Sequence, residues 1–198
     1  MGDGALPEDG TLIAALNAGG STLPVWSCLA MGLISELHQD PVAWSLTVFR
    51  EAKAPARGWM MRFFHGPGEA RDAILHVGLD DRSKRVRLWA CEGTEHSHDR
   101  KRWLPRLALM RQSDPALEVR EAAQHSHDII DKGYRVNLKG GRWCFLVENQ
   151  VGSIVACDFD EVAYRSYGEE TLARMLMTRD SRLSDVEREM NDRRTAAG

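Results

Sequence analysis

The chain has 198 residues, of which 43% are apolar and 28% charged, and its formal net charge is −3. This composition is that of a self-folding globular protein, and it excludes a disordered or fibrous chain. The slight acidic excess disfavours a protein that binds nucleic acid through its overall charge.

Two features of the sequence predict a cytoplasmic protein that contacts no membrane. The first ten residues carry neither the basic segment nor the apolar core of a signal peptide, and no apolar run approaches the ~18 residues of a membrane helix. The cysteines form no C-x-x-C pair, so we expect four reduced thiols, at Cys28, Cys91, Cys144 and Cys157.

The chain begins with two predicted helices. A short one covers Thr11–Asn17 and ends before Gly19 and Gly20. The second runs from Ser21 to about His38, where Asp40-Pro41 stops it because the residue before a proline avoids helical angles. An apolar stripe with a spacing of four consists of Val25, Leu29, Leu33 and Leu37, and Trp26, Ala30 and Ile34 widen it. The pattern predicts that most of this helix is buried.

A four-stranded antiparallel meander is expected next. Alternation as in Trp44/Leu46/Val48 is typical of half-buried strands, and the breaks between the segments contain proline, glycine and aspartate. Connections of three to six residues are too short for parallel crossovers. The predicted strands are Ala43–Glu51, Gly58–His65, Ala73–Leu79 and Arg85–Cys91.

Two more helices are predicted before the next strands. From Ser97 the apolar period becomes helical, with Trp103, Leu107 and Met110 on one face. Asp114-Pro115 then opens a helix that reaches Asp131.

A β-hairpin around Gly140-Gly141 is the clearest local pattern in the chain. A two-residue turn there pairs Lys139 with Arg142 and so fixes the register of two strands from Tyr134 to Val147. Residues 153–159 form a third strand, and Asp160 caps a helical segment that Gly168 divides.

The predicted fold is therefore α+β, with an antiparallel sheet of about seven strands and helices packed on one face. Residues 1–182 form one domain, and 183–198 form a charged helical tail that opens with a capping box at Ser184–Glu187. The layout is similar to that of small bacterial adaptor proteins and secreted-effector chaperones.

Three groups of residues are candidate sites. The tetrapeptide His-Ser-His-Asp occurs at 96–99 and at 125–128, so His96, His98, His125 and His127 could bind zinc, or they could be a polar loop and a solvated helix end. The basic cluster could contact nucleic acid or an acidic protein surface, or it could be a solvated helix face; it consists of Arg100, Lys101, Arg102, Arg106 and Arg111.

The third group is Cys28, near the start of a helix, and His76 in the strand-like segment His76-Val77-Gly78. This pair resembles the NlpC/P60 branch of papain-like cysteine peptidases, and the resemblance implies a nucleophile at Cys28 and a base at His76. The alternative is a buried structural thiol.

The sequence thus favours a cytosolic, non-enzymatic adaptor or chaperone-like accessory protein that contacts other proteins, without metal or cofactor. A homodimer is also expected to be possible. The alternatives are a cysteine hydrolase that uses Cys28 and His76, and a nucleic-acid accessory protein that uses the basic helix 100–111.

Overall fold

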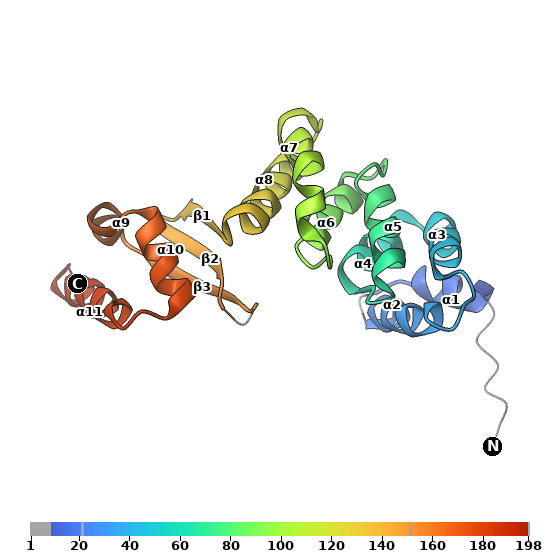
Figure 1. Ribbon diagram of the computed structural model, residues 1–198, viewed down its shortest axis with the longest axis horizontal. Helices are drawn as coiled ribbons and strands as arrows, with labels where there is room; N and C mark the ends of the chain where they lie inside the picture. The colour runs from blue at the N-terminus through green and yellow to red at the C-terminus, as the bar shows by residue number, and fades with distance from the viewer. Residues whose placement is uncertain (1–8, 21, 151, 198) are drawn as a thin grey trace, which may run out of the picture. The chain divides into compact units, whose positions relative to one another are not determined.

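The computed structural model describes residues 9–20, 22–150 and 152–197 (Figure 1). This part of the chain is mostly helical, with 11 α-helices and one three-stranded antiparallel sheet near the C-terminus. The predicted α+β fold with about seven strands is therefore wrong. The chain separates into two compact units, one up to His127 and one from Asp128 onward, with the division inside a helix.

Both predicted N-terminal helices are present as α1 (Asp9–Leu16) and α2 (Thr22–Ser35). Ser21, the expected first residue of α2, lies outside the described residues. The predicted buried stripe is wrong at Trp26, Leu33 and Leu37, which are 65%, 69% and 68% exposed, whereas Ile34 is buried. The buried face is another side of the helix, made of Pro24, Ser27, Cys28, Met31, Gly32, Ile34 and Ser35.

The four predicted meander strands are all helices. Their buried residues recur at helical spacing, as Val86, Trp89, Ala90 and Gly93 show in the last of them. The helices are α3 (Pro41–Glu51), α4 (Ala54–Phe63), α5 (Gly68–Gly78) and α6 (Lys84–Thr94).

The residues that indicated turns in this region are instead the residues that start helices. Asp40 accepts a hydrogen bond from the Ala43 N–H at 2.9 Å, and Pro41 stands in the first turn of α3. Pro55 has the same place in α4, and Pro67 directly precedes α5. A proline in the first helical turn removes an N–H that has no intrahelical partner, so it favours a helix start as well as a turn.

Alternate helices pack side by side. We call α2, α4 and α6 the first row and α3 and α5 the second row, since α4 contacts α2 and α6 while α3 contacts α5. A glycine allows the close approach of α4 and α6, because a Cβ at Gly58 would lie 2.6 Å from Cε3 of Trp89. This arrangement of stacked helix pairs is the packing principle of helical-repeat proteins.

The helices predicted beyond Ser97 are confirmed. A 3₁₀-turn, η1 (Arg100–Trp103), leads into α7 (Leu104–Ser113), and α8 (Leu117–Lys132) follows. Trp103, Leu107 and Met110 are buried as expected.

The hairpin and its register are confirmed. Strands β1 (Tyr134–Lys139), β2 (Arg142–Glu148) and β3 (Ile154–Phe159) form a meander in which Lys139 pairs with Arg142. Gly140 and Gly141 have φ values of +56° and +74°, as a tight turn between antiparallel strands requires.

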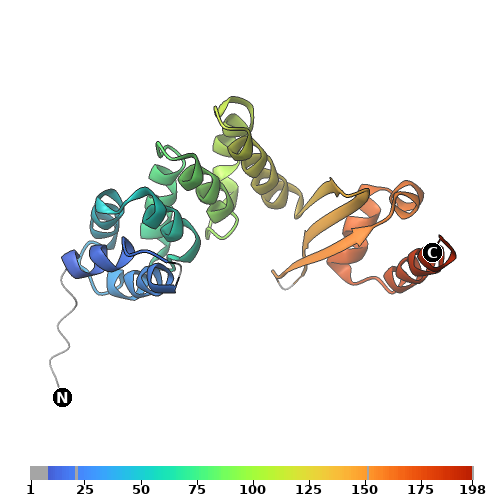
Figure 2. The same cartoon turned by 180° about the vertical axis from the view of Figure 1, so that it is seen from behind.

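Three helices complete the second unit. They are α9 (Glu161–Tyr167), α10 (Glu169–Thr178) and α11 (Arg182–Ala197). The Asp160 cap is confirmed by a 2.8 Å hydrogen bond from the Ala163 N–H, and Gly168 divides α9 from α10. Helix α10 lies in front of the sheet in Figure 1 and behind it in Figure 2, so it covers one face.

The helical tail is present, but it starts at Arg182, so Ser184 lies inside α11 rather than at its cap. Val186 is fully buried in the core of the second unit, together with Phe145, Phe159 and Leu172. The first eight residues lie outside the described part of the chain. Within that part, no helix combines the length and the apolar character needed to cross a membrane.

Candidate binding groove

A groove of about 420 Å³ lies on the face formed by α3 and α5. Val42 and Leu46 line it from α3, one helical turn apart, and Ala73 and Val77 line it from α5 with the same spacing. All four side chains are half-buried, so they form an apolar floor that is open to solvent.

Polar side chains form the rim of this groove. Glu69 and His76 are exposed at opposite ends of α5, and Asp72 lies between them. Asp72 accepts a hydrogen bond from Ser97 Oγ at 2.7 Å, and it forms an ion pair with Arg102 Nη1 at 2.9 Å. The guanidinium of Arg102 also lies 4.8 Å from the ring of Trp103, and nearly half of the Arg102 side chain stays exposed.

Two other members of the basic cluster also contact neighbouring elements of the same unit. Arg106 pairs with Asp80, and Arg111 donates a hydrogen bond to Gln124 Oε1 at 3.1 Å. Lys101 is exposed and Arg100 is half-buried. The cluster is therefore divided among several internal contacts, and Arg102 is its member at the groove.

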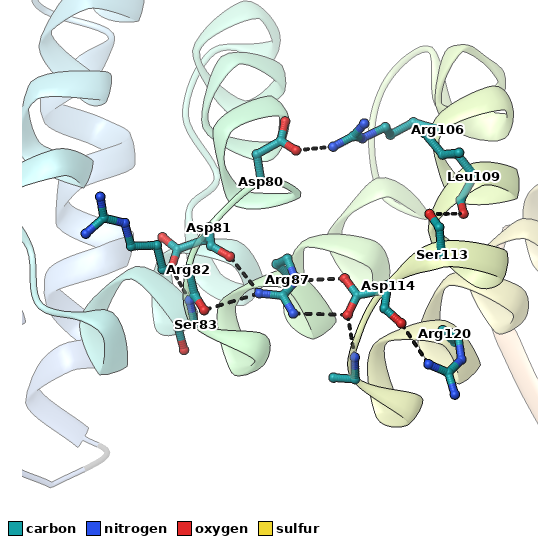
Figure 3. A network of polar contacts seen from close by, with 11 residues as sticks. Asp80, Asp81, Arg82, Ser83, Arg87, Arg106, Leu109, Ser113, Asp114 and Arg120 are labelled. Carbon is teal, nitrogen blue, oxygen red and sulfur yellow. Dashed lines mark hydrogen bonds and ion pairs between the residues drawn. The ribbon is translucent and has the colours of Figure 1, made fainter.

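An ion-pair network holds the neighbouring helices together (Figure 3). Arg87 of α6 donates two hydrogen bonds to Asp114, at 2.7 and 3.0 Å, and one to the carbonyl of Asp81 at 2.8 Å. The Asp81 carboxylate accepts two more from Arg57 of α4, at 2.6 and 3.1 Å. Paired, two-pronged bonds of this kind fix the relative orientation of the groups that they join.

Burial acts to raise the pKa of Asp114, because its side chain is only 5% exposed. The hydrogen bonds from Arg87 and from the Ala116 N–H outweigh this effect, so the pKa of Asp114 lies below its usual value. Asp114 is therefore a charged group at neutral pH that joins α6 to the start of α8.

Cys28 and His76, the residues of the cysteine-hydrolase alternative, lie in different surroundings from each other. Cys28 is fully buried on α2, and desolvation raises the pKa of its thiol to about 12, so the thiol is protonated at neutral pH. His76 is exposed on α5, and the groove that it lines does not include Cys28. The geometry therefore favours a structural thiol at Cys28 and places His76 at the groove rim.

In the two His-Ser-His-Asp segments, the serines make the buried contacts. Ser97 bonds Asp72, and Ser126 of α8 donates to Glu95 Oε1 at 2.7 Å. His96 and His98 are exposed before η1, whereas His125 and His127 are half-buried on α8. Among the described residues, no three His, Cys, Asp or Glu side chains are grouped so that they could bind a metal ion.

The second unit has a larger hollow, of about 540 Å³, and all four side chains that line it carry a polar or charged group. Lys132, Tyr134, Glu169 and Glu170 line it. Desolvation and the neighbouring Glu169 raise the pKa of Tyr134 to about 12, so the phenol stays protonated and can donate a hydrogen bond. The α3/α5 groove is the better binding candidate, because an apolar floor with a few polar groups at its rim is typical of recognition sites.

Comparisons of the chain with protein-family models, with curated proteins and with solved structures gave no match.

Four groove residues were missed by sequence reasoning. Leu46, Ala73 and Val77 were assigned to strands, and Val42 was assigned to no element. The signal that could have found them is their pairing at i and i+4 outside the buried face of each helix.

Proposed function

We propose that the protein is a cytosolic, non-enzymatic binding protein, of adaptor or chaperone-like type, whose α3/α5 groove binds an amphipathic helix of a partner protein. The groove is the observation that supports this proposal, since it combines an apolar floor with polar rim groups on two packed helices. A helix that lies in such a groove places apolar side chains on the floor at intervals of three and four residues.

The polar groups at the rim determine which side chains the partner helix should carry. Glu69 is an exposed carboxylate at the start of α5, so it favours a lysine or arginine at one end of the bound helix. Asp72 is already paired with Arg102, whose partly exposed guanidinium has further N–H groups for an acceptor on the ligand. The partner is therefore an amphipathic helix with a basic residue beside its apolar stripe.

The cysteine-hydrolase and nucleic-acid alternatives receive less support. The Cys28 thiol is buried and protonated at neutral pH, and three of the five basic residues contact neighbouring elements of their own unit.

A selection of displayed amphipathic helical peptides on the full chain tests the proposal. Peptides chosen on the wild-type protein should lose at least about tenfold in affinity on Ala73→Arg, which fills the floor with a long charged side chain. The matched control is Ala43→Arg, an exposed position of α3 that does not line the groove. Equal binding to wild type and Ala73→Arg would contradict the groove as the binding site.

A further inference from the structure

Helix α2 carries an exposed apolar stripe that the groove does not explain. Its large members are Leu23, Trp26, Leu33 and Leu37, which are 51%, 65%, 69% and 68% exposed. With the half-buried Ala30, these residues follow one another at intervals of three, four, three and four residues. At 100° per residue this spacing places the first four on one narrow side of α2, as in the seam of a coiled coil, and Leu37 follows in the turn after Ser35, where α2 ends.

The stripe is unusual for the end of a stack of helices. Helix α2 contacts α1, α3 and α4, and it is the last helix of the first row in the described chain. A stacked helical unit normally has a polar outer face at its ends. Here no residue from Gly10 to Ser35 is charged. An uncharged helix with apolar side chains on both sides is typical of a helix that is covered on both sides.

We propose that a second copy of this chain covers the stripe, with the two α2 helices antiparallel across a two-fold axis at Ala30. Large apolar side chains lie on both sides of that point. Trp26 and Leu33 flank the small Ala30 on either side, and Leu23 and Leu37 lie beyond them. In an antiparallel pair Leu23 faces Leu37 of the second copy, while the two alanines allow the helix axes to approach closely.

Charge also suits this pairing. The stripe has no charged member that would meet its own copy, and Glu36, just after α2, would lie beside the N-terminal end of the opposite α2. A carboxylate there interacts favourably with the partial positive charge of a helix N-terminus.

The exposed area sets the strength of the dimer. The four large side chains expose roughly 450 Å² per chain, against about 800 Å² per partner in a standard stable interface. We therefore expect a reversible dimer that dissociates on dilution, with a Kd of roughly micromolar to tens of micromolar. Each dimer would carry two copies of the α3/α5 groove, which increases avidity for a partner with repeated sites.

Sedimentation equilibrium of the full chain at increasing concentration tests this inference. The mass should rise from 22.2 kDa toward twice that value. Leu33→Glu should weaken association by more than about tenfold, because two carboxylates would be buried near the axis. Leu109→Glu is the matched control, since Leu109 is a 52% exposed leucine on α7, and it should associate like the wild type.

Disulfide cross-linking tests the antiparallel orientation of the two α2 helices, in a variant that also carries Cys144→Ser and Cys157→Ser. Ala30→Cys should form an interchain disulfide on mild oxidation, whereas Leu37→Cys should not, because antiparallel packing separates the two copies of residue 37. A chain that stays monomeric at several hundred micromolar overturns the inference, and so does a dimer that Leu33→Glu leaves intact. Failure here is distinct from failure of the groove, since Ala73→Arg should leave self-association unchanged.

Discussion

Replacing Arg87 by alanine should destabilise the helical unit severely. The Arg87 and Asp114 side chains are 13% and 5% exposed, and the substitution removes both hydrogen bonds to Asp114 together with those to the carbonyls of Asp81 and Arg82. A charged partner left nearly buried without its counterion costs about 3–5 kcal/mol. For a unit of this size that loss lowers the melting temperature by roughly 10–20 °C. Calorimetry of the full chain measures it.

The matched control is the ion pair between Lys84 and Glu118, which is equally short at 2.7 Å but is 63% and 54% exposed. Lys84→Ala should leave the melting temperature nearly unchanged, because water and salt screen an exposed pair. A melting temperature of Arg87→Ala within about 2 °C of the wild type would refute the reasoning that this network holds the helices together.

Four further predictions follow from individual contacts. The pKa of Asp114 is lowered in the folded state. The charged carboxylate therefore stabilises the fold above the unfolded pKa of about 3.9, and this stabilisation is lost as the pH falls through the folded pKa. The melting temperatures of wild type and Asp114→Asn should converge at low pH. Native alkylation followed by mass spectrometry should label the half-buried Cys144 before the fully buried Cys28 and Cys91, whose pKa values are raised to about 12; rapid labelling of Cys28 that His76→Ala abolishes would restore the hydrolase hypothesis. Gly58→Ala should cost about 1–3 kcal/mol in a denaturant melt because its Cβ overlaps Trp89, whereas Gly68→Ala, whose Cβ has open space, should be nearly neutral. Val186→Ala should cost about 2 kcal/mol through the cavity that it leaves, and an unchanged melt would show that α11 does not belong to the second core.

The sequence predicted the C-terminal half of the fold better than the N-terminal half. Gly140-Gly141 determined the hairpin register, because a two-residue turn leaves one pairing between the flanking strands. Asp160 and Gly168 likewise marked a helix start and a helix boundary through capping chemistry that depends on one or two residues. Such local signals do not depend on what the rest of the chain does.

The four helices α3 to α6 were missed because they are only 10 or 11 residues long. In α3, Trp44 and Val48 fit a period of two and also a helical spacing of four, and the intervening Leu46 faces the groove instead of the core. Small residues such as Gly58 lie where two helices cross. The buried faces therefore contain fewer large apolar residues than a recognisable amphipathic pattern needs.

The candidate sites, like helices α3 to α6, could not be identified from local sequence patterns alone. His76 and Arg102 were singled out for a peptidase and for a basic surface, but they share the rim of one groove whose floor was read as strand. In α2, apolar residues lie on every side, so spacing alone could not identify the face that packs against α4. Which side of such a helix is buried depends on contacts between distant segments.

The most direct measurement of the central claim is amide chemical-shift mapping of the full chain with a peptide selected as described above. The perturbed amides should cluster on α3 and α5, around Val42, Leu46, Ala73 and Val77. A peptide with its basic residue replaced by glutamate should bind more weakly, because Glu69 then meets a like charge. Perturbations confined to the second unit, or to the exposed stripe of α2, would contradict the α3/α5 groove as the binding site.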